Sequence, residues 1–352
     1  MSFEVTVRPS GRTFVVEGNE TVLEAALRSG IGLPYGCKNG ACGTCKARVL
    51  DGTWTQAAHA SSALRPDEAA QGGLLVCTSR PTSALTLEAR ELSGFGDIPI
   101  RKMPARIAKI ERPAPDVAIV SLQLPANERL QFRAGQYLEF ILKDGSRRSY
   151  SMATAPHADE LIQLHIRHMP GGKYTDGLFA SPPSVKERDI VRIEAPLGTF
   201  FLREDEPGPI VLLASGTGFA PIKAIAEHIF HKRLNRDEPN RPARRVTLYW
   251  GCRRPSDLYL DGLPRRWAEE QPNFTYVPVL SDATPEDAWT GRTGFVHQAV
   301  MQDLPDLSSH RVYACGAPVM VDSARADFTA RCGLPADSFY ADAFTSEADK
   351  GR

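Results

Sequence analysis

The chain has 352 residues, and 42% of them are hydrophobic, which is enough apolar material for two or three domain cores. Its 42 acidic and 42 basic residues cancel and are interspersed, so we expect no basic surface suited to nucleic acid. No apolar run approaches the roughly 20 residues of a membrane span, and the first residues alternate apolar and polar, unlike a secretory signal. The composition therefore predicts a folded, cytoplasmic protein that binds neither nucleic acid nor membranes.

The N-terminal segment predicts strands packed around one helix. Residues 3–7 and 12–18 alternate like the strands of a hairpin. Residues 19–30 carry an N-cap candidate, an apolar face and a final glycine, which predicts a helix. Residues 45–54 return as a strand with an Asp-Gly turn. This order is typical of a small β-grasp unit.

Three cysteines crowd into the stretch YGCKNGACGTCK, and a fourth follows after about thirty residues, the spacing described for plant-type [2Fe-2S] ferredoxins. Cytosolic thiols are normally kept reduced, so clustered cysteines favour metal binding over disulfides. The intervening glycines let backbone N–H groups approach the sulfides of a cluster. The cysteines are Cys37, Cys42, Cys45 and Cys77.

A structural zinc site is the alternative for these four thiols. Such sites usually show two short C-x2-C pairs, whereas here the fourth cysteine is solitary and the first gap is long. Four unrelated buried thiols would have no reason to share one glycine-rich loop. Residues 1–93 resemble a plant-type ferredoxin domain, and the resemblance implies that the four cysteines ligate a [2Fe-2S] cluster.

A composition change predicts the start of a second domain. Residues 94–103 mix glycine and proline without a sustained period, which indicates a linker. The following domain, residues 104–206, contains alternating runs such as 105–113 and 117–125. With Asp144-Gly145 as a hairpin turn, these runs predict an antiparallel β-barrel.

The pattern of apolar segments changes again in the last domain, residues 207–352. Short apolar strands, beginning with PIVLLA, alternate with helical segments such as 221–233 and 319–333. This alternation predicts a parallel α/β sheet.

Two motifs in the second domain resemble the flavin-binding domain of the ferredoxin-NADP reductase superfamily. The first is R-x-Y-S, formed by Arg148, Tyr150 and Ser151, and the second follows in PGGKYTDGLF. A flavin pyrophosphate needs a fixed cation and backbone donors, and its ring needs an aromatic cover. The resemblance implies that Arg148 holds phosphate, Tyr150 stacks on FAD and Ser151 lies near its N5 atom. It further implies a pyrophosphate lining of Gly171, Gly172, Thr175 and, with weaker support, Arg167.

The third domain carries the string LLASGTGFAPI between a buried strand and a helix. Helix N-termini present unpaired N–H groups and attract phosphate. The string lacks the full G-x-G-x-x-G fingerprint, which disfavours a generic Rossmann dehydrogenase. It and the later YACGAP segment resemble the nicotinamide-binding domain of the same superfamily. The resemblance implies a nucleotide site at Gly216, Thr217, Gly218, Pro221, Cys315 and Gly316, with Cys315 facing the nicotinamide. A buried, inert cysteine is the alternative interpretation of Cys315.

Other residues concern the nucleotide less directly. Phe344 in YADAFT is a candidate aromatic cover for the flavin, with core packing as the alternative. Arg253 and Arg254 could meet a 2′-phosphate, whereas Asp257 would repel one. The segment resembles NADH-using oxygenase reductases, so we expect NADH, with NADPH possible. Cys252 and Cys332 are interpreted as packing residues.

Taken together, the chain resembles a multidomain α+β reductase: a β-grasp ferredoxin domain, an antiparallel β-barrel flavin domain and a parallel α/β nicotinamide-binding domain. FAD accepts a hydride and releases electrons singly, as a one-electron cluster requires. The resemblance implies Ser151 and Cys315 as catalytic residues.

The resemblance also implies that electrons leave for a redox protein partner. That partner is a non-haem iron (Rieske-type) oxygenase or, alternatively, a deoxysugar dehydratase served by a CDP-6-deoxy-glucoseen-type reductase. A redox sensor with the same cofactors and a reductase that releases reduced flavin remain further alternatives. The sequence does not decide the oligomeric state.

Overall fold

The computed structural model describes residues 2–92, 97–158 and 160–345, so residues 94–96 of the predicted linker lie outside the described part. The chain divides into two compact units. The first comprises residues 1–99 with 198–200 and 342–352, and the second comprises residues 100–197 and 201–341.

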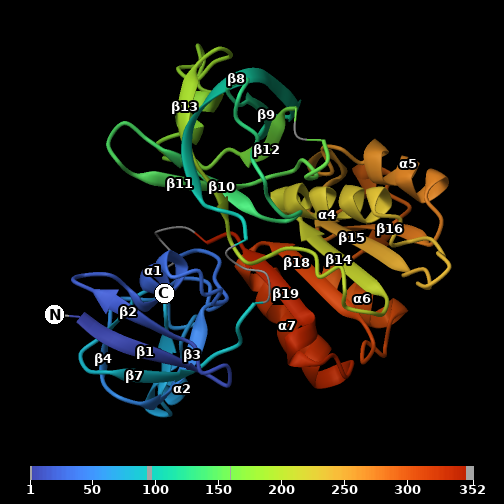
Figure 1. The fold of residues 1–352 in the computed structure, drawn as a ribbon. Helices are drawn as coiled ribbons and strands as arrows, with labels where there is room; N and C mark the ends of the chain where they lie inside the picture. The colour runs from blue at the N-terminus through green and yellow to red at the C-terminus, as the bar shows by residue number, and fades with distance from the viewer. Residues whose placement is uncertain (1, 93–96, 159, 346–352) are drawn as a thin grey trace. The chain divides into compact units, whose positions relative to one another are not determined.

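The first unit is built on a five-stranded mixed sheet in the order β2-β1-β7-β3-β5. Strand β1 pairs antiparallel with β2 and parallel with β7 (Figure 1). This arrangement confirms the predicted β-grasp class. The bounds are β1 Ser2–Arg8, β2 Thr13–Glu17, β3 Lys46–Asp51, β5 Gly73–Leu75 and β7 Leu85–Glu88.

Helix α1 (Val22–Arg28) is shorter than the predicted 19–30 because Thr21 caps it. The Thr21 hydroxyl accepts a hydrogen bond from the Glu24 backbone N–H at 3.2 Å, and the Glu24 carboxylate accepts one from the Thr21 backbone N–H at 2.8 Å. This reciprocal capping box satisfies two N–H groups that would otherwise lack partners. The helix buries Val22, Leu23, Ala25 and Ala26 in the core of the unit.

The predicted Asp-Gly turn does not join two paired strands. Strand β3 ends at Asp51, but β4 (Trp54–Gln56) pairs with β6 (Ser79–Pro81) in a separate two-stranded sheet. A second helix of this unit is α2 (Pro66–Ala70).

The second unit begins with a six-stranded antiparallel sheet in the order β11-β10-β13-β8-β9-β12. An antiparallel bridge between Met152 and Leu164 joins its two edges and closes the predicted barrel. Strand β8 starts at Arg101, so its first three residues lie within the predicted linker. The bounds are β8 Arg101–Ala114, β9 Val117–Gln123, β10 Tyr137–Ile141, β11 Arg147–Ser151, β12 Ile162–Arg167, α3 Thr175–Phe179 and β13 Ile190–Leu197.

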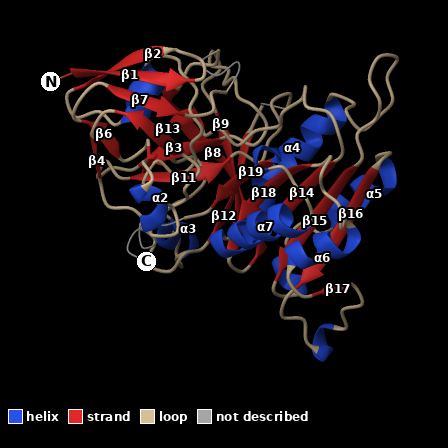
Figure 2. Ribbon diagram, turned by 90° about the horizontal axis from the view of Figure 1, so that it is seen from below, coloured by secondary structure: helices blue, strands red, loops and turns tan. Residues whose placement is uncertain are grey.

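The second sheet of this unit has the order β17-β16-β15-β14-β18-β19, and the strands from β17 to β18 pair in parallel. Helices α4 and α5 cover one face and α6 and α7 the other (Figures 1 and 2). The strand bounds are β14 Ile210–Ser215, β15 Val246–Cys252, β16 Phe274–Leu280, β17 Arg292–Thr293, β18 Arg311–Gly316 and β19 Phe339–Ala343. The helix bounds are α4 Phe219–His231, α5 Gly262–Glu270, α6 Val296–Asp303 and α7 Pro318–Arg331.

Short 3-10 turns follow several of these strands. They are η1 Gly216–Gly218, η2 Pro255–Asp257, η3 Pro285–Asp287 and η4 Ala336–Ser338. Strand β14 lies between β15 and β18, so the chain changes direction across the sheet at this strand. Ligands of such sheets bind outside the carboxyl ends of the strands at this switch point. The fold therefore directs attention to the ends of β14, β15 and β18.

Within the described ranges, no helix combines the length and apolar character needed to cross a bilayer.

Candidate functional site

The four predicted cluster ligands lie in the first unit as two pairs of thiols. Cys45 Sγ lies 3.1 Å from Cys77 Sγ, and Cys37 is hydrogen-bonded to Cys42. Among the described residues, no three cysteine, histidine or carboxylate side chains converge on one point as ligands of a single ion. Two pairs of thiols fit the two irons of a [2Fe-2S] centre better than one tetrahedral zinc ion.

The electrostatics of the four cysteines favour deprotonation of one sulfur in each pair. The hydrogen bond from Cys42 lowers the pKa of Cys37 to about 5. Burial opposes this shift, and backbone N–H groups, including those of Asn39 and Ala41, add to it. The hydrogen bond from Cys45 similarly lowers the pKa of Cys77. The donors, Cys42 and Cys45, have raised pKa values because they hold the shared protons and are buried. Iron would displace these protons, and the N–H groups would then face the negative cluster.

The loop takes this shape because a glycine sits where a side chain would collide. Gly43 has φ +71°, and a Cβ there would lie 2.9 Å from the Ala63 carbonyl oxygen. Tyr35, just before the loop, is buried, and its hydroxyl accepts a hydrogen bond from the Gly198 N–H at 2.9 Å. The Tyr35 N–H donates to the Thr199 hydroxyl at 2.8 Å. These bonds fix the start of the loop within the first unit.

Asp342 is a buried carboxyl that sequence reasoning did not find. It belongs to the first unit, and a Cβ on Gly36 would lie 3.3 Å from its Oδ1 atom. Burial, followed by the negative charge of Cys37, raises the pKa of Asp342 to about 7. Its neighbour Phe344, the predicted flavin cover, also belongs to the first unit and is 39% exposed. No sequence pattern marked Asp342, because its environment comes from residues distant in the chain.

Strand β11 places the R-x-Y-S motif on the wall of the barrel. The Tyr150 ring meets Phe140 edge-on at 5.2 Å between centroids, and burial raises the pKa of its hydroxyl. Ser151 is buried next to it. The Arg148 guanidinium donates to its neighbour's carbonyl, that of Arg147, at 2.7 Å. The motif thus combines an aromatic surface, a small hydroxyl and a cation, as flavin binding requires.

The glycine segment after β12 forms a tight turn that leads into α3. The Thr175 hydroxyl donates to the Met169 carbonyl at 2.9 Å, so it shapes the turn. A Cβ on Gly172 would lie 2.3 Å from that hydroxyl oxygen, which leaves room only for glycine. The Gly171 N–H donates to the Asp176 carboxylate at 3.1 Å. Beside the motif, the buried Tyr174 hydroxyl has no hydrogen-bond partner in the described structure, which fits a polar ligand at this position.

Arg167 lies nearer the nicotinamide segment than its predicted pyrophosphate role suggests. It forms an ion pair with Asp116 at 2.7 Å and a longer one with Asp257 at 3.8 Å. A Cβ on Gly216 would lie 3.1 Å from its Nη1 atom. Arg167 therefore joins the barrel to the parallel sheet within the second unit.

The G-T-G-x-x-P string forms the predicted strand-to-helix turn at the end of β14. Gly216, Thr217 and Gly218 make up η1, and Pro221 lies in the first turn of α4. A Cβ on Gly218 would lie 2.1 Å from the Cys315 carbonyl oxygen, so the turn packs directly on the end of β18. The helix N-terminus at this turn offers backbone donors to a phosphate.

A second contact between the ends of β14 and β18 involves Ser215 and the residues Gly316 and Ala317. Gly316 has φ +138°, and a Cβ there would lie 2.2 Å from the Ser215 hydroxyl oxygen. That hydroxyl accepts a hydrogen bond from the Ala317 N–H at 2.9 Å. Cys315 is fully buried at the same edge. The structure therefore brings the two predicted nicotinamide segments together.

Three side chains near this edge were missed by sequence reasoning. The Trp250 indole N–H donates to the Gly216 carbonyl at 2.9 Å and so holds the glycine turn. His165 on β12 and the Tyr259 hydroxyl are hydrogen-bonded at 2.8 Å, and burial lowers the pKa of His165 to about 3. The neutral imidazole and the tyrosine link the barrel to the nucleotide sheet.

Cys252 and Cys332 are buried, in agreement with their interpretation as packing residues. Burial raises the pKa of Cys252 to about 12. Such thiols are inert.

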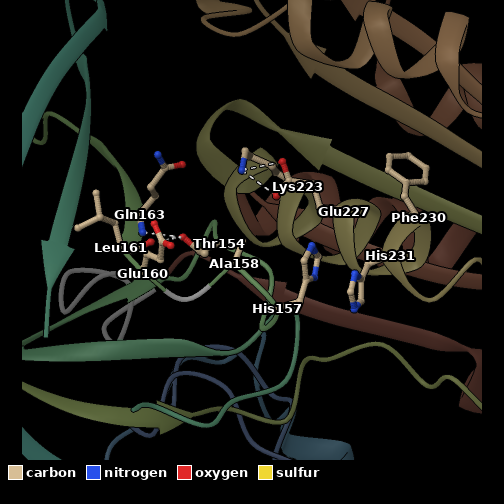
Figure 3. Close-up of a pocket in the computed structure, with 10 residues that line it drawn as sticks. All are labelled: Thr154, His157, Ala158, Glu160, Leu161, Gln163, Lys223, Glu227, Phe230 and His231. Atoms are coloured by element: carbon tan, nitrogen blue, oxygen red, sulfur yellow. Dashed lines mark hydrogen bonds and ion pairs between the residues drawn. The ribbon is translucent and has the colours of Figure 1, made fainter. Parts of the chain in front are cut away.

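A separate cavity of about 590 Å³ lies between α4 and the segment that joins β11 to β12 (Figure 3). Its lining includes His157, His231 and the ion pair of Lys223 with Glu227 at 2.9 Å. None of the predicted cofactor residues lines it. The cofactor site is therefore assigned from the motifs and their packing, independently of this cavity.

The comparisons with known proteins match the three domains in the predicted order. Residues 5–82 match the 2Fe-2S iron-sulfur cluster binding domain, residues 104–202 the oxidoreductase FAD-binding domain, and residues 212–326 the oxidoreductase NAD-binding domain. The family matches confirm the [2Fe-2S], FAD and nicotinamide nucleotide cofactors and the reductase class.

Relatives match over nearly the whole chain. The CDP-6-deoxy-L-threo-D-glycero-4-hexulose-3-dehydrase reductase of Yersinia pseudotuberculosis serotype I (strain IP32953) is 41% identical over 98% of this chain and 99% of its own. Reductase component 1 of the terephthalate 1,2-dioxygenase of Comamonas sp is 34% identical over 98% of both chains. The crystal structure of the Amycolatopsis cytochrome P450 reductase GcoB superposes with a TM-score of 0.77 at 34% identity, over 98% of this chain and 99% of that one. This protein therefore belongs to the family of flavin iron-sulfur NAD(P)H oxidoreductases, which transfer electrons from the nucleotide through FAD and a [2Fe-2S] cluster.

Proposed function

We propose that this reductase oxidises NADH and delivers single electrons to the metal centre of a separate protein, a non-haem iron oxygenase of the Rieske type. The observation that carries the proposal is the pairing of four cysteine thiols in the first unit. A flavin domain that only reduced free flavin would not need this second redox centre. Similarity to an oxygenase reductase component over 98% of the chain supports the choice of partner.

The proposed domains are the ferredoxin domain, residues 1–93, the linker 94–103, the flavin domain 104–206 and the nicotinamide domain 207–352. The proposed use of four cysteines as iron ligands, which must be reduced thiols, supports a reducing, cytoplasmic environment.

In the flavin domain, the side chains of β11 bind and orient the cofactor. Arg148 would contact the pyrophosphate, and the backbone of Gly171 and Gly172 would approach it closely. Tyr150 would cover the flavin ring with its aromatic face, while the buried Ser151 hydroxyl would lie at the reacting edge. When bound, FAD supplies a hydride acceptor that returns electrons one at a time.

In the nicotinamide domain, the packed ends of β14 and β18 position the hydride donor. The N–H groups of the turn at residues 216–218 and the N-terminus of α4 would bind the dinucleotide phosphates. Gly316 would contact the nicotinamide ring, and Cys315, whose side chain is fully buried in this structure, would reach it only after a local shift of this edge. Because Gly218 and Cys315 are in backbone contact, a shift of either segment would displace both the phosphates and the nicotinamide ring.

A dehydratase that makes a deoxysugar is the second candidate partner. It is favoured by the 41% identity to a hexulose-3-dehydrase reductase over 98% of this chain. Both partners would receive electrons from the same cluster, so the cofactor chemistry of this chain is the same for the two.

The first experiment is an anaerobic titration of the purified protein with NADH, followed by visible absorption and electron spin resonance. We expect bleaching of the flavin and cluster bands and a rhombic signal of the reduced cluster. A protein that contains zinc in place of iron, or a cluster that NADH does not reduce, would contradict the proposal.

A second experiment identifies the partner. The reduced protein is mixed anaerobically with a Rieske oxygenase or with a deoxysugar dehydratase, and the reoxidation of its cluster is followed. Faster reoxidation by the oxygenase supports the main proposal, whereas faster reoxidation by the dehydratase supports the alternative.

A further inference from the structure

The segment after β15 carries two consecutive arginines at a position that matters for nucleotide choice. In parallel nucleotide-binding sheets, an acidic residue near the end of the second strand binds the ribose 2′-hydroxyl of NADH, whereas an arginine there accommodates the 2′-phosphate of NADPH. Arg253, Arg254 and Asp257 follow β15 directly. Their existing contacts therefore bear on which nucleotide fits.

Arg254 is already engaged by a short acidic turn from another part of the chain. Its Nη2 atom lies 2.8 Å from Asp287 Oδ1 and donates to the Thr284 hydroxyl at 3.1 Å. Asp287 is fixed in turn, because its Oδ2 atom accepts the Thr284 backbone N–H at 2.9 Å. The Asp287 side chain is only 13% exposed, whereas that of Arg254 is 42% exposed.

Backbone hydrogen bonds hold this turn beside the arginines. The Ser281 N–H donates to the Cys252 carbonyl at 2.9 Å, and the Asp282 N–H donates to the Arg253 carbonyl at 3.0 Å. The chain after β16 thus continues along the end of β15 before it forms η3. The contact of Asp287 with Arg254 follows from this backbone arrangement.

The second arginine is neutralised as well. Arg253 Nε lies 3.1 Å from Asp257 Oδ2, and Asp257 Oδ1 lies 3.8 Å from Arg167 Nη2. Glu286 adds a further negative charge that acts on Arg254. Arg253 and Arg254 therefore each have a carboxylate partner, and a dianionic phosphate would compete with these carboxylates.

We propose that Asp287, with Thr284, is a specificity-determining residue that withholds Arg254 from a 2′-phosphate and thereby favours NADH over NADPH. The inference rests on the proposed function and deepens it. It assigns nucleotide choice to the turn after β16 together with the residues after β15. NADH has a neutral 2′-hydroxyl and needs no cation at this position, whereas NADPH must separate Arg254 from Asp287 or remain beside the carboxylate.

The test replaces Asp287 by asparagine, which removes the charge and preserves the shape of the side chain. We expect the ratio of kcat/KM for NADPH to that for NADH to rise about two- to fivefold, the range expected for a partly exposed charge pair. Calorimetric titration of the oxidised holoprotein with 2′,5′-ADP and 5′-AMP gives a readout without turnover. The relative affinity for 2′,5′-ADP should rise by the same factor.

Two further variants distinguish a specific contact from a general change of charge. Asp282→Asn removes the same charge from an exposed position on the same segment and should leave both ratios unchanged. Arg254→Gln alone should change the ratios by less than about twofold, because Arg254 is withheld in the native protein. Arg254→Gln combined with Asp287→Asn should cancel most of the gain that Asp287→Asn gives alone.

An unchanged ratio in an Asp287→Asn protein that still oxidises NADH would overturn the inference while leaving the proposed function intact. A large loss of 2′,5′-ADP affinity in Arg254→Gln alone would also overturn it, since Arg254 would then already serve the phosphate. This variant changes a partly exposed side chain and keeps the test valid if Asp287→Asn folds poorly. A native protein that oxidises neither nucleotide would refute the proposed function itself.

Discussion

The cysteine loop and the edge formed by β14 and β18 hold their proposed ligands in different ways. The loop, residues 36–45, has no regular secondary structure and offers sulfur atoms as ligands. The edge offers few reactive side chains and consists of backbone segments in contact, such as Gly218 against Cys315. Ligand binding by the loop depends on cysteine side chains, whereas the packing of the edge depends on glycines, which have no side chain.

This difference predicts how each region fails. Replacement of one sulfur in the loop should remove a ligand while the fold of the sheets persists. An added methyl group at the edge should disturb the packing of two strands and thereby affect both stability and nucleotide binding. Mutations of the loop therefore test electron transfer from the cluster to the acceptor, whereas mutations of the edge test binding of the hydride donor.

The largest expected effect comes from Cys45→Ser in the cysteine loop. Cys45 is buried and paired with Cys77, and a serine hydroxyl is a poor ligand for iron. We expect the variant to lose its cluster and at least about 100-fold of its electron transfer to a protein acceptor. Reduction of bound FAD by NADH, measured by stopped-flow absorption, should persist.

The control is Cys332→Ser, which changes another buried cysteine, in the second unit. Its iron content should equal that of the native protein. If Cys45→Ser kept its iron, or if both variants lost it equally, the assignment of the cluster ligands would be wrong.

The edge of the parallel sheet should respond to Gly316→Ala. A Cβ would overlap the Ser215 hydroxyl at 2.2 Å, and φ +138° is strained for alanine. We expect a loss of at least about 2 kcal/mol in the free energy of unfolding and weaker NADH binding. Urea denaturation and stopped-flow flavin reduction measure the two effects.

Gly262→Ala provides a matched control, because a Cβ there meets nothing within 4 Å and the backbone is not in the left-handed region. It should be neutral or slightly stabilising. Equal behaviour of the two alanine variants would show that the edge tolerates added volume, contrary to the packing argument.

The sequence predicted the three main sheets and assigned each motif to its domain because each motif combines local residues. Cysteine spacing, R-x-Y-S and the glycine string are all readable within about a dozen neighbouring positions, apart from the distant Cys77. The pairing of β4 with β6 was not predictable, because the Asp-Gly signal marks a turn but not the partner of the next strand. Asp342 beside the cysteine loop and the His165–Tyr259 contact join positions far apart in the chain, so no local pattern announces them.

An intermediate effect is expected on strand β11 of the flavin domain. Its adjacent residues Arg147 and Arg148 point to opposite faces of the sheet. Arg148→Gln removes the proposed cation for the pyrophosphate and should weaken FAD binding at least about tenfold, as expected for a charge-assisted hydrogen bond. Arg147 instead pairs with the buried Glu139 at 2.7 Å and with Glu194. Arg147→Gln should therefore lower stability without lowering FAD affinity, as fluorescence titration of the apoprotein with FAD would show. Equal loss of FAD in both variants would contradict the assignment of Arg148.

The smallest effect concerns the stacked pair His157 and His231 in the cavity beside α4, whose ring centroids lie 3.9 Å apart (Figure 3). Burial, followed by the nearby His231 and His228, lowers the pKa of His157 below 6.5. Below pH 6.5 the unfolded chain binds a proton that the folded chain binds less readily, so this group reduces stability as the pH falls. Because His157 is mostly exposed, solvent screening should keep the effect below about 1 kcal/mol. Urea denaturation between about pH 7.5 and pH 5.5 should show a smaller loss of stability for His157→Gln than for the native protein. The native and variant proteins share all other titrating groups, so the difference between their pH dependences isolates the contribution of His157. An identical pH dependence of stability in the two proteins would contradict a lowered pKa of His157.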